Sequence, residues 1–196
     1  IIDVNELSLN GFNQILVDDI AGGQKAVEYL IELGHQRIGY ISDPLEDPFH
    51  FTASRARFEG YCRAHNNAGI PVLPELHRHG EHGRYEARSL AEEMLSLPER
   101  PTAIFTASDT QAIGVLEAAR ERGFRVPQDL SVIGYDDIEL AEHLGLTTIQ
   151  QLLFESGQKG VELLLAVIAD AERRPASEIL PTELVIRNTS SAPGVD

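Results

Sequence analysis

The chain has 196 residues, 42% of them hydrophobic and 24% charged, which is long enough to bury a sizeable core. No apolar run approaches the roughly 20 residues that a membrane helix needs. The formal net charge is -15, with 16 Lys and Arg against 31 Asp and Glu, so phosphate backbones should be repelled and any DNA contact should lie outside these residues. Cys62 is the single cysteine, which rules out an internal disulfide and suits a reducing cytoplasm.

Short apolar runs alternate with amphipathic helical patterns along the chain. The pattern predicts, in chain order, a strand over 15–17, a helix capped by Asp18 or Asp19 and ended by Gly34, a strand over 37–42, helices over 53–68 and 85–97, a strand over 102–107, a helix over 110–122, strands over 130–135 and 147–149, a helix around 161–168 and a last strand over 183–187. Strands that alternate with helices of this length usually pair in parallel through right-handed crossovers. An open, doubly wound α/β sheet is therefore expected.

Two of the predicted strands stop abruptly at polar residues. The segment VPQDLSVIGYDD ends at Asp136 and Asp137, and the apolar run over 102–107 ends at Ser108 and Asp109. In open α/β sheets the carboxyl ends of the strands border the ligand crevice. We therefore expect these oxygens to accept hydrogen bonds from a bound polar molecule.

Five segments of the chain match a known protein family: LGHQRIGYI (33–41), SRARFEGY (54–61), VPQDLSVIGYDD (126–137), LGLTTIQQ (144–151) and LPTELVIRNTS (180–190). Through them the chain resembles the LacI/GalR family of transcription regulators, from its first residues to about Ser190. The resemblance implies a periplasmic-binding-protein-like effector-binding and dimerisation core, whose N-terminal helix-turn-helix, hinge helix and first βα units have no counterpart before Ile1.

The same resemblance implies two subdomains joined by crossing segments. Residues 18–149 and 177–196 would form the C-terminal subdomain, and residues 1–17 and 150–176 an incomplete N-terminal one. Without its missing units, the second subdomain should leave apolar side chains of its helix exposed, at Leu164, Leu165 and Ile168.

Arg57 and Asp136 are the principal site predictions. A guanidinium can make paired hydrogen bonds to neighbouring hydroxyls or a carboxylate, and the matching positions of the family contact the effector. A structural ion pair within the subdomain is the alternative role for Arg57. Ser108 is also expected to contact the ligand, but it departs from the asparagine usual in the family, which leaves the identity of the effector open. Asp109 is interpreted as a helix N-cap rather than as a ligand contact. Asp137 is expected to brace the loop.

Three further ligand contacts follow from the resemblance. His82 aligns with an aromatic residue that stacks on the ligand, and Asp3 and Gln151 match positions near the cleft. An imidazole could cover the C–H face of a sugar in the same way as an aromatic ring.

The sequence supports a metal site or a catalytic site less well than a ligand-binding site. The cluster of His77, His79 and His82 permits a zinc site, but no cysteine completes a tetrahedron, and a charged surface loop explains the cluster as well. Asp109, Asp136 and Asp137 could bind Mg²⁺, yet no phosphate-binding loop accompanies them. The sequence also lacks a Gly-x-Ser-x-Gly motif. We expect no metal, no cofactor and no enzymatic activity.

Three function classes remain open. The first is the sensor core of a DNA-binding regulator, a homodimer that closes on a small polar effector such as a sugar and reaches operator DNA through an N-terminal domain absent from this chain. Residues 85–97 and 140–144 occupy the matching dimer positions. The alternatives are a periplasmic-type sugar carrier, which a secretory signal would favour, and an α/β enzyme, which turnover of a sugar or nucleotide would favour.

Overall fold

The computed structural model describes residues 12–46, 51–170 and 172–194. Its elements are β1 (Gln14–Val17), α1 (Asp19–Glu32), β2 (Ile38–Ser42), α2 (Ala53–Ala68), a 3₁₀ turn (Pro74–Leu76), β3 (His77–His79), α3 (Arg84–Leu95), β4 (Ala103–Thr106), α4 (Asp109–Glu121), β5 (Ser131–Asp136), α5 (Glu139–Leu144), β6 (Thr147–Gln151), α6 (Leu153–Ala169), β7 (Ser177–Leu180) and β8 (Thr182–Val185). None of the described helices has the length and apolar character needed to cross a membrane.

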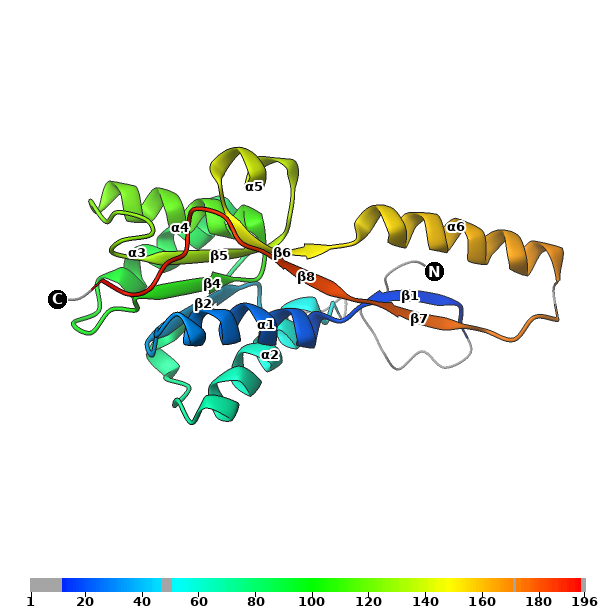
Figure 1. The fold of residues 1–196 in the computed structure, drawn as a ribbon, viewed down its shortest axis with the longest axis horizontal. Helices are drawn as coiled ribbons and strands as arrows, with labels where there is room; N and C mark the ends of the chain where they lie inside the picture. The colour runs from blue at the N-terminus through cyan, green and yellow to red at the C-terminus, as the bar shows by residue number, and fades with distance from the viewer. Residues whose placement is uncertain (1–11, 47–50, 171, 195–196) are drawn as a thin grey trace.

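A six-stranded sheet in the order β3-β2-β4-β5-β6-β8 forms the larger part of the molecule (Figure 1). Its strands pair in parallel, except that β8 runs antiparallel to β6. The predicted α/β class with a doubly wound parallel sheet is confirmed. Because the parallel strands share one direction, their carboxyl ends lie at one edge of the sheet.

Helices cover both faces of this sheet and enclose two cores. The helices α1 and α2 pack on one face and α3 and α4 on the other (Figure 1). Successive residues of a strand point to opposite faces, so that Ile104 joins the core under α3 and α4 whereas Phe105 joins the core under α1 and α2. Both side chains are fully buried, as expected for central strands of a parallel sheet.

A smaller part extends away from this sheet and consists of α6 and the parallel pair β1–β7 (Figure 1). The apolar side chains Leu164, Leu165 and Ile168 of α6 are 58%, 60% and 71% exposed, which confirms the exposure expected from an incomplete subdomain. Ser177–Leu180, predicted to belong to the C-terminal subdomain, pairs instead with β1. The chain thus returns to the large sheet at β8, and the remaining subdomain boundaries stay predictions.

Candidate functional site

The strands β2, β4, β5 and β6 all end at one edge of the large sheet, and the polar residues that follow them are linked by hydrogen bonds. Gln111, in the first turn of α4, donates to Asp43 after β2 at 2.9 Å. Gln151 at the end of β6 donates to Asp136 at the end of β5. The expectation that strand ends bring oxygens together is therefore met in the geometry.

Arg57 lies at the centre of this edge, on the first turns of α2. Its Nε donates to Asp19 at 2.7 Å, its Nη1 donates to the carbonyl of Ala107, and its guanidinium lies 3.7 Å from the centre of the Tyr135 ring. Nη1 also lies 3.8 Å from the Asp136 carboxylate. Burial lowers the pKa of Arg57, but Asp19, Tyr135 and Asp136 more than offset this effect and raise it above its usual value. Arg57 is a permanent, buried cation.

Asp136 and Asp137 form a turn with unusual backbone angles. Their φ values are 119° and 57°, both in the region that residues with a side chain rarely adopt. Arg187 holds the Asp137 carboxylate at 2.8 Å and Gln150 donates to it at 2.9 Å, so Asp137 braces the turn as predicted. Burial raises the pKa of Asp136, whereas Arg57 and Gln151 partly oppose that rise. The turn thus presents a partly buried carboxylate beside a guanidinium.

Ser108, and not Asp109, caps the helix that follows β4. Ser108 is the N-cap of α4, and its hydroxyl accepts from the amide of Gln111 at 3.2 Å. Asp109 is fully buried and accepts from the Thr148 hydroxyl at 2.6 Å and the Ile138 amide at 2.9 Å. Burial raises its pKa to about 6 despite these donors. The predicted N-cap role of Asp109 is wrong, because the preceding residue caps the helix and Asp109 ties β4 to β6.

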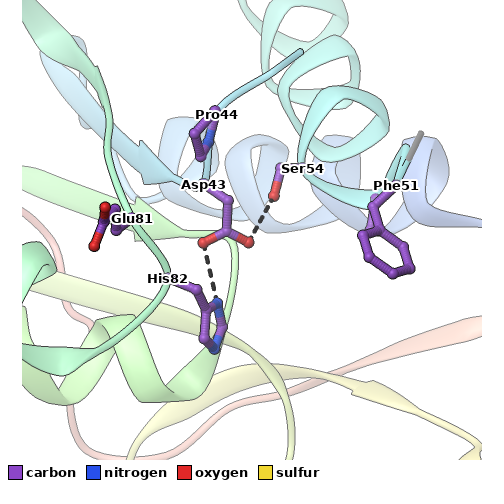
Figure 2. Close-up of a pocket in the computed structure, with 7 residues that line it drawn as sticks. Asp43, Pro44, Phe51, Ser54, Glu81 and His82 are labelled. Carbon is purple, nitrogen blue, oxygen red and sulfur yellow. Dashed lines mark hydrogen bonds and ion pairs between the residues drawn. The ribbon is translucent and has the colours of Figure 1, made fainter. Parts of the chain in front are cut away.

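A cavity of about 520 Å³ opens beside these residues (Figure 2). The Asp43 carboxylate stands at its centre and accepts from His82 at 3.0 Å, from Ser54 at 3.2 Å and from Gln111. Its lining residues are Asp43, Pro44, Phe51, Ala53, Ser54, Glu81 and His82. His82 and Ser54 contact Asp43 from different segments of the chain, and Phe51 lies on the other side of the view from Glu81 (Figure 2).

Only some of the predicted site residues contact one another in the structure. Arg57, Asp136 and Gln151 form one connected group, His82 lines the cavity, and Ser108 caps a helix at the same edge. Asp3 lies outside the described residues. His77 and His79 approach to 3.3 Å on β3, and the described residues contain no group of three or more His, Cys, Asp or Glu arranged to hold a metal ion.

Sequence reasoning missed Asp19, Asp43 and Gln111. A signal for Asp43 is present, because the apolar strand β2 ends at a serine followed by an aspartate, and the apolar run over 102–107 is likewise followed by Ser108 and Asp109. Asp19 carries no such signal, because its importance comes from packing of α1 against α2 and not from its neighbours in sequence.

Residues 27–190 match the periplasmic binding protein-like domain family. Among curated proteins, the chain is 38% identical over 180 residues to the HTH-type transcriptional repressor CytR of Escherichia coli (strain K12). The aligned region covers 90% of this chain and 51% of CytR. The chain is 36% identical over 179 residues to the HTH-type transcriptional repressor PurR of Vibrio atlanticus (strain LGP32), with 90% and 52% covered. The chain therefore spans about half the length of these relatives, which are repressors and not enzymes.

Solved structures agree with this assignment. A regulatory protein of the LacI family from Chloroflexus aggregans superposes with a TM-score of 0.84 at 34% identity, covering 91% of this chain and 64% of that one. A LacI family transcriptional regulator from Enterococcus faecium with bound ribose gives 0.86 at 28% identity, with 97% and 69% covered. The transcriptional regulator CelR in complex with cellobiose gives 0.85 at 30% identity, with 94% and 57% covered. The chain belongs to the periplasmic binding protein-like domain family, and its predicted resemblance to the effector-binding core of LacI-type regulators is confirmed.

Proposed function

We propose that this chain is the effector-sensing core of a DNA-binding transcription regulator and that it binds a small polyhydroxylated molecule at the edge defined by Arg57 and Asp136. The observation that carries the proposal is the pair itself. A buried guanidinium, which donates hydrogen bonds, and a partly buried carboxylate, which accepts them, stand 3.8 Å apart at the carboxyl edge of the large sheet. Vicinal hydroxyls can bond to both groups, since a hydroxyl both accepts and donates.

Relatives support a sugar as the ligand. The structures with bound ribose and bound cellobiose share this fold with the chain. The named relatives are repressors, which favours the regulator over the alternative of a periplasmic-type sugar carrier. A location in the cytoplasm follows from this proposal, because operator DNA is found there.

Regulation would act through a homodimer whose DNA-binding parts lie outside this chain. Exposed apolar side chains support the predicted dimer positions: Tyr85 is 74% exposed on α3, and Leu140 and Leu144 are 47% and 43% exposed on α5. Ligand binding between subdomains would favour one of two rigid-body arrangements and change the spacing of the two DNA-binding parts.

Isothermal titration calorimetry with D-ribose and cellobiose tests the proposed site. Asp136→Asn keeps the shape of the turn and the acceptor for Gln151, but it removes the charge that strengthens a hydroxyl bond. We expect about tenfold to hundredfold weaker binding, which corresponds to about 1.5 to 3 kcal/mol. Glu32→Gln, an exposed change at the far end of α1, is the matched control and should bind as the wild type does. Equal affinity of Asp136→Asn and wild type would refute the site.

A further inference from the structure

The cavity beside Arg57 has an unbalanced set of charges. Asp43 and Glu81 line it, and Asp136 borders the same edge. Among the described residues, the cationic groups here are Arg57 and, when protonated, His82. Carboxylates therefore outnumber cations around the space that a ligand would fill.

Arg57 has little capacity left for an anionic ligand. Its Nε is bonded to Asp19, its Nη1 to a carbonyl, and one face of its guanidinium lies on the Tyr135 ring. Asp19 already balances its charge, with both side chains only 10% exposed. A ligand carboxylate or phosphate approaching Arg57 would also approach Asp136, which lies 3.8 Å from Nη1. The attraction that usually selects an anion is thus already satisfied inside the protein.

The polar atoms that remain open at this cavity are mostly acceptors. Both carboxylate oxygens of Asp43 accept hydrogen bonds, and a carboxylate has room to accept one further bond. In neutral His82, a donating Nδ1 leaves Nε2 as an acceptor. The acceptors that Asp43 and His82 present to the cavity therefore favour a ligand that carries hydrogen-bond donors.

We infer that the Asp43 cavity selects uncharged or cationic hydrogen-bond donors, such as neutral sugars and amino sugars, and rejects uronates and sugar phosphates, with Asp43 as the specificity-determining residue. The inference rests on the proposed function and narrows its ligand class. Phe51, 63% exposed at the cavity, and Pro44 supply apolar surface for the C–H face of such a ring.

Differential scanning fluorimetry followed by calorimetry on the whole protein tests this inference with matched probes. The first set is D-glucose, D-glucosamine and D-glucuronate, and the second is D-ribose and D-ribose 5-phosphate, with cellobiose added for size. We expect each anionic probe to bind at least tenfold more weakly than its neutral parent. Higher ionic strength should narrow this difference, because salt screens charge repulsion.

Asp43→Asn tests the assigned residue. Asparagine keeps the acceptor for His82 and Gln111 and can still bond Ser54, so the cavity should keep its shape. We expect the difference between neutral and anionic probes to shrink to within about threefold in this variant, while the Glu32→Gln control removes the same charge at a distance and should leave the difference unchanged. Glu81→Gln, at an exposed position, provides a second variant if Asp43→Asn does not fold.

The outcomes separate this inference from the proposal on which it rests. An anionic probe that binds as tightly as its neutral parent would overturn the inference, as would an unchanged difference in both Asp43→Asn and Glu81→Gln. If neutral probes bind but Asp136→Asn binds them equally well, the proposed site fails at Arg57 and Asp136. If no probe binds at all, both the proposed function and this inference are refuted for sugars.

Discussion

The Arg57–Asp19 pair is the residue contact on which the site most depends. Both side chains are buried, so loss of one partner leaves an uncompensated charge in a region with little water. We expect Asp19→Asn to lower the free energy of unfolding by about 3 to 5 kcal/mol, measured by urea denaturation. The control is Glu59→Gln, which removes an i,i+4 pair with Arg63 whose side chains are 50% and 53% exposed. That change should cost no more than about 0.5 kcal/mol, and equal effects of the two changes would contradict a buried pair.

Asp109 predicts a pH dependence of stability. Burial raises the pKa of Asp109 to about 6 in the folded protein, from the ordinary value of 3.8 that we assume for the unfolded chain. Between these values the folded state binds more protons than the unfolded state, so the contribution of Asp109 is full below about pH 4 and is lost as the pH rises through about 6. Asp109→Asn should remove a decline on the order of 2 kcal/mol over this window.

Urea denaturation of Asp109→Asn at intervals from pH 4 to pH 7 measures the effect. Asparagine can accept from the Ile138 amide and donate to the Thr148 hydroxyl, so the hydrogen bonds of the site are retained. If the free energy of unfolding changes with pH in the same way in wild type and variant, the raised pKa of Asp109 is contradicted.

At the residue scale, the sequence predicts the sheet edge at which the site lies but not every residue that contacts Arg57 and Asp43. Asp136 and Arg57 were predicted from the strand end and from the resemblance, and the structure places them 3.8 Å apart, although no observation yet tests ligand contact. The partner Asp19 and the donor Gln111 could not be predicted, because they approach only after helices pack on the sheet. Asp109 was predicted as the N-cap because either residue type can cap a helix, and the hydrogen bond from the Gln111 amide to the Ser108 hydroxyl shows that Ser108 has this role.

At the element scale, the close packing of α1 on α2 places Arg57. Both helices carry a glycine at the contact: a Cβ on Gly60 would overlap the backbone of Ile20 and Gln24, and one on Gly23 would overlap the backbone of Arg57. We therefore expect Gly60→Ala to separate the helices, to destabilise the protein by about 1 to 3 kcal/mol and to weaken ligand binding. Thermal unfolding and calorimetry measure the two effects.

Gly157 in α6 provides the matched control for this change. A Cβ at Gly157 meets no atom within 4 Å, so Gly157→Ala should stabilise the helix by about 0.5 to 1 kcal/mol through its better helix propensity. Stabilisation of the protein by Gly60→Ala, or equal signs for the two variants, would contradict a tight helix contact.

Most helices and strands could be predicted from their capping residues and from the periodicity of their apolar residues. The helix over 53–68 begins and ends where it was predicted, because Gly69 adopts a left-handed C-cap. Asp18 caps α1 by accepting from the Ala21 amide, which settles the choice between Asp18 and Asp19. β3 was missed because His77–His79 has no apolar alternation and becomes a strand only by pairing with β2. The sequence pattern does not predict the helix α5, because its 6 residues are too few to show a helical periodicity.

At the scale of the whole molecule, the chain combines one well-covered sheet with an open smaller part. The large sheet is covered by helices on both faces, whereas α6 leaves Leu164, Leu165 and Ile168 exposed beside a two-stranded sheet. The chain spans 51% of the length of its relative CytR. Contiguous exposed apolar side chains of this kind are typical of an interaction surface. Sequence patterns predicted this exposure, but which strand returns to which sheet depended on long-range pairing that no local pattern encodes.

Operator binding by the whole protein, measured with and without the sugar that it binds, is the most direct test of the proposed sensor function. A ligand that prefers one arrangement of the core must change DNA affinity by the same factor by which DNA changes ligand affinity. Fluorescence anisotropy with a DNA fragment from upstream of the gene should therefore show at least a fivefold change in affinity at saturating ligand, typical of allosteric coupling. At a ligand concentration near the wild-type Kd, the change should be much smaller in Asp136→Asn, which is expected to bind the ligand about tenfold to hundredfold more weakly. Sequence-selective DNA binding that is identical with and without bound ligand would contradict the proposed sensor function.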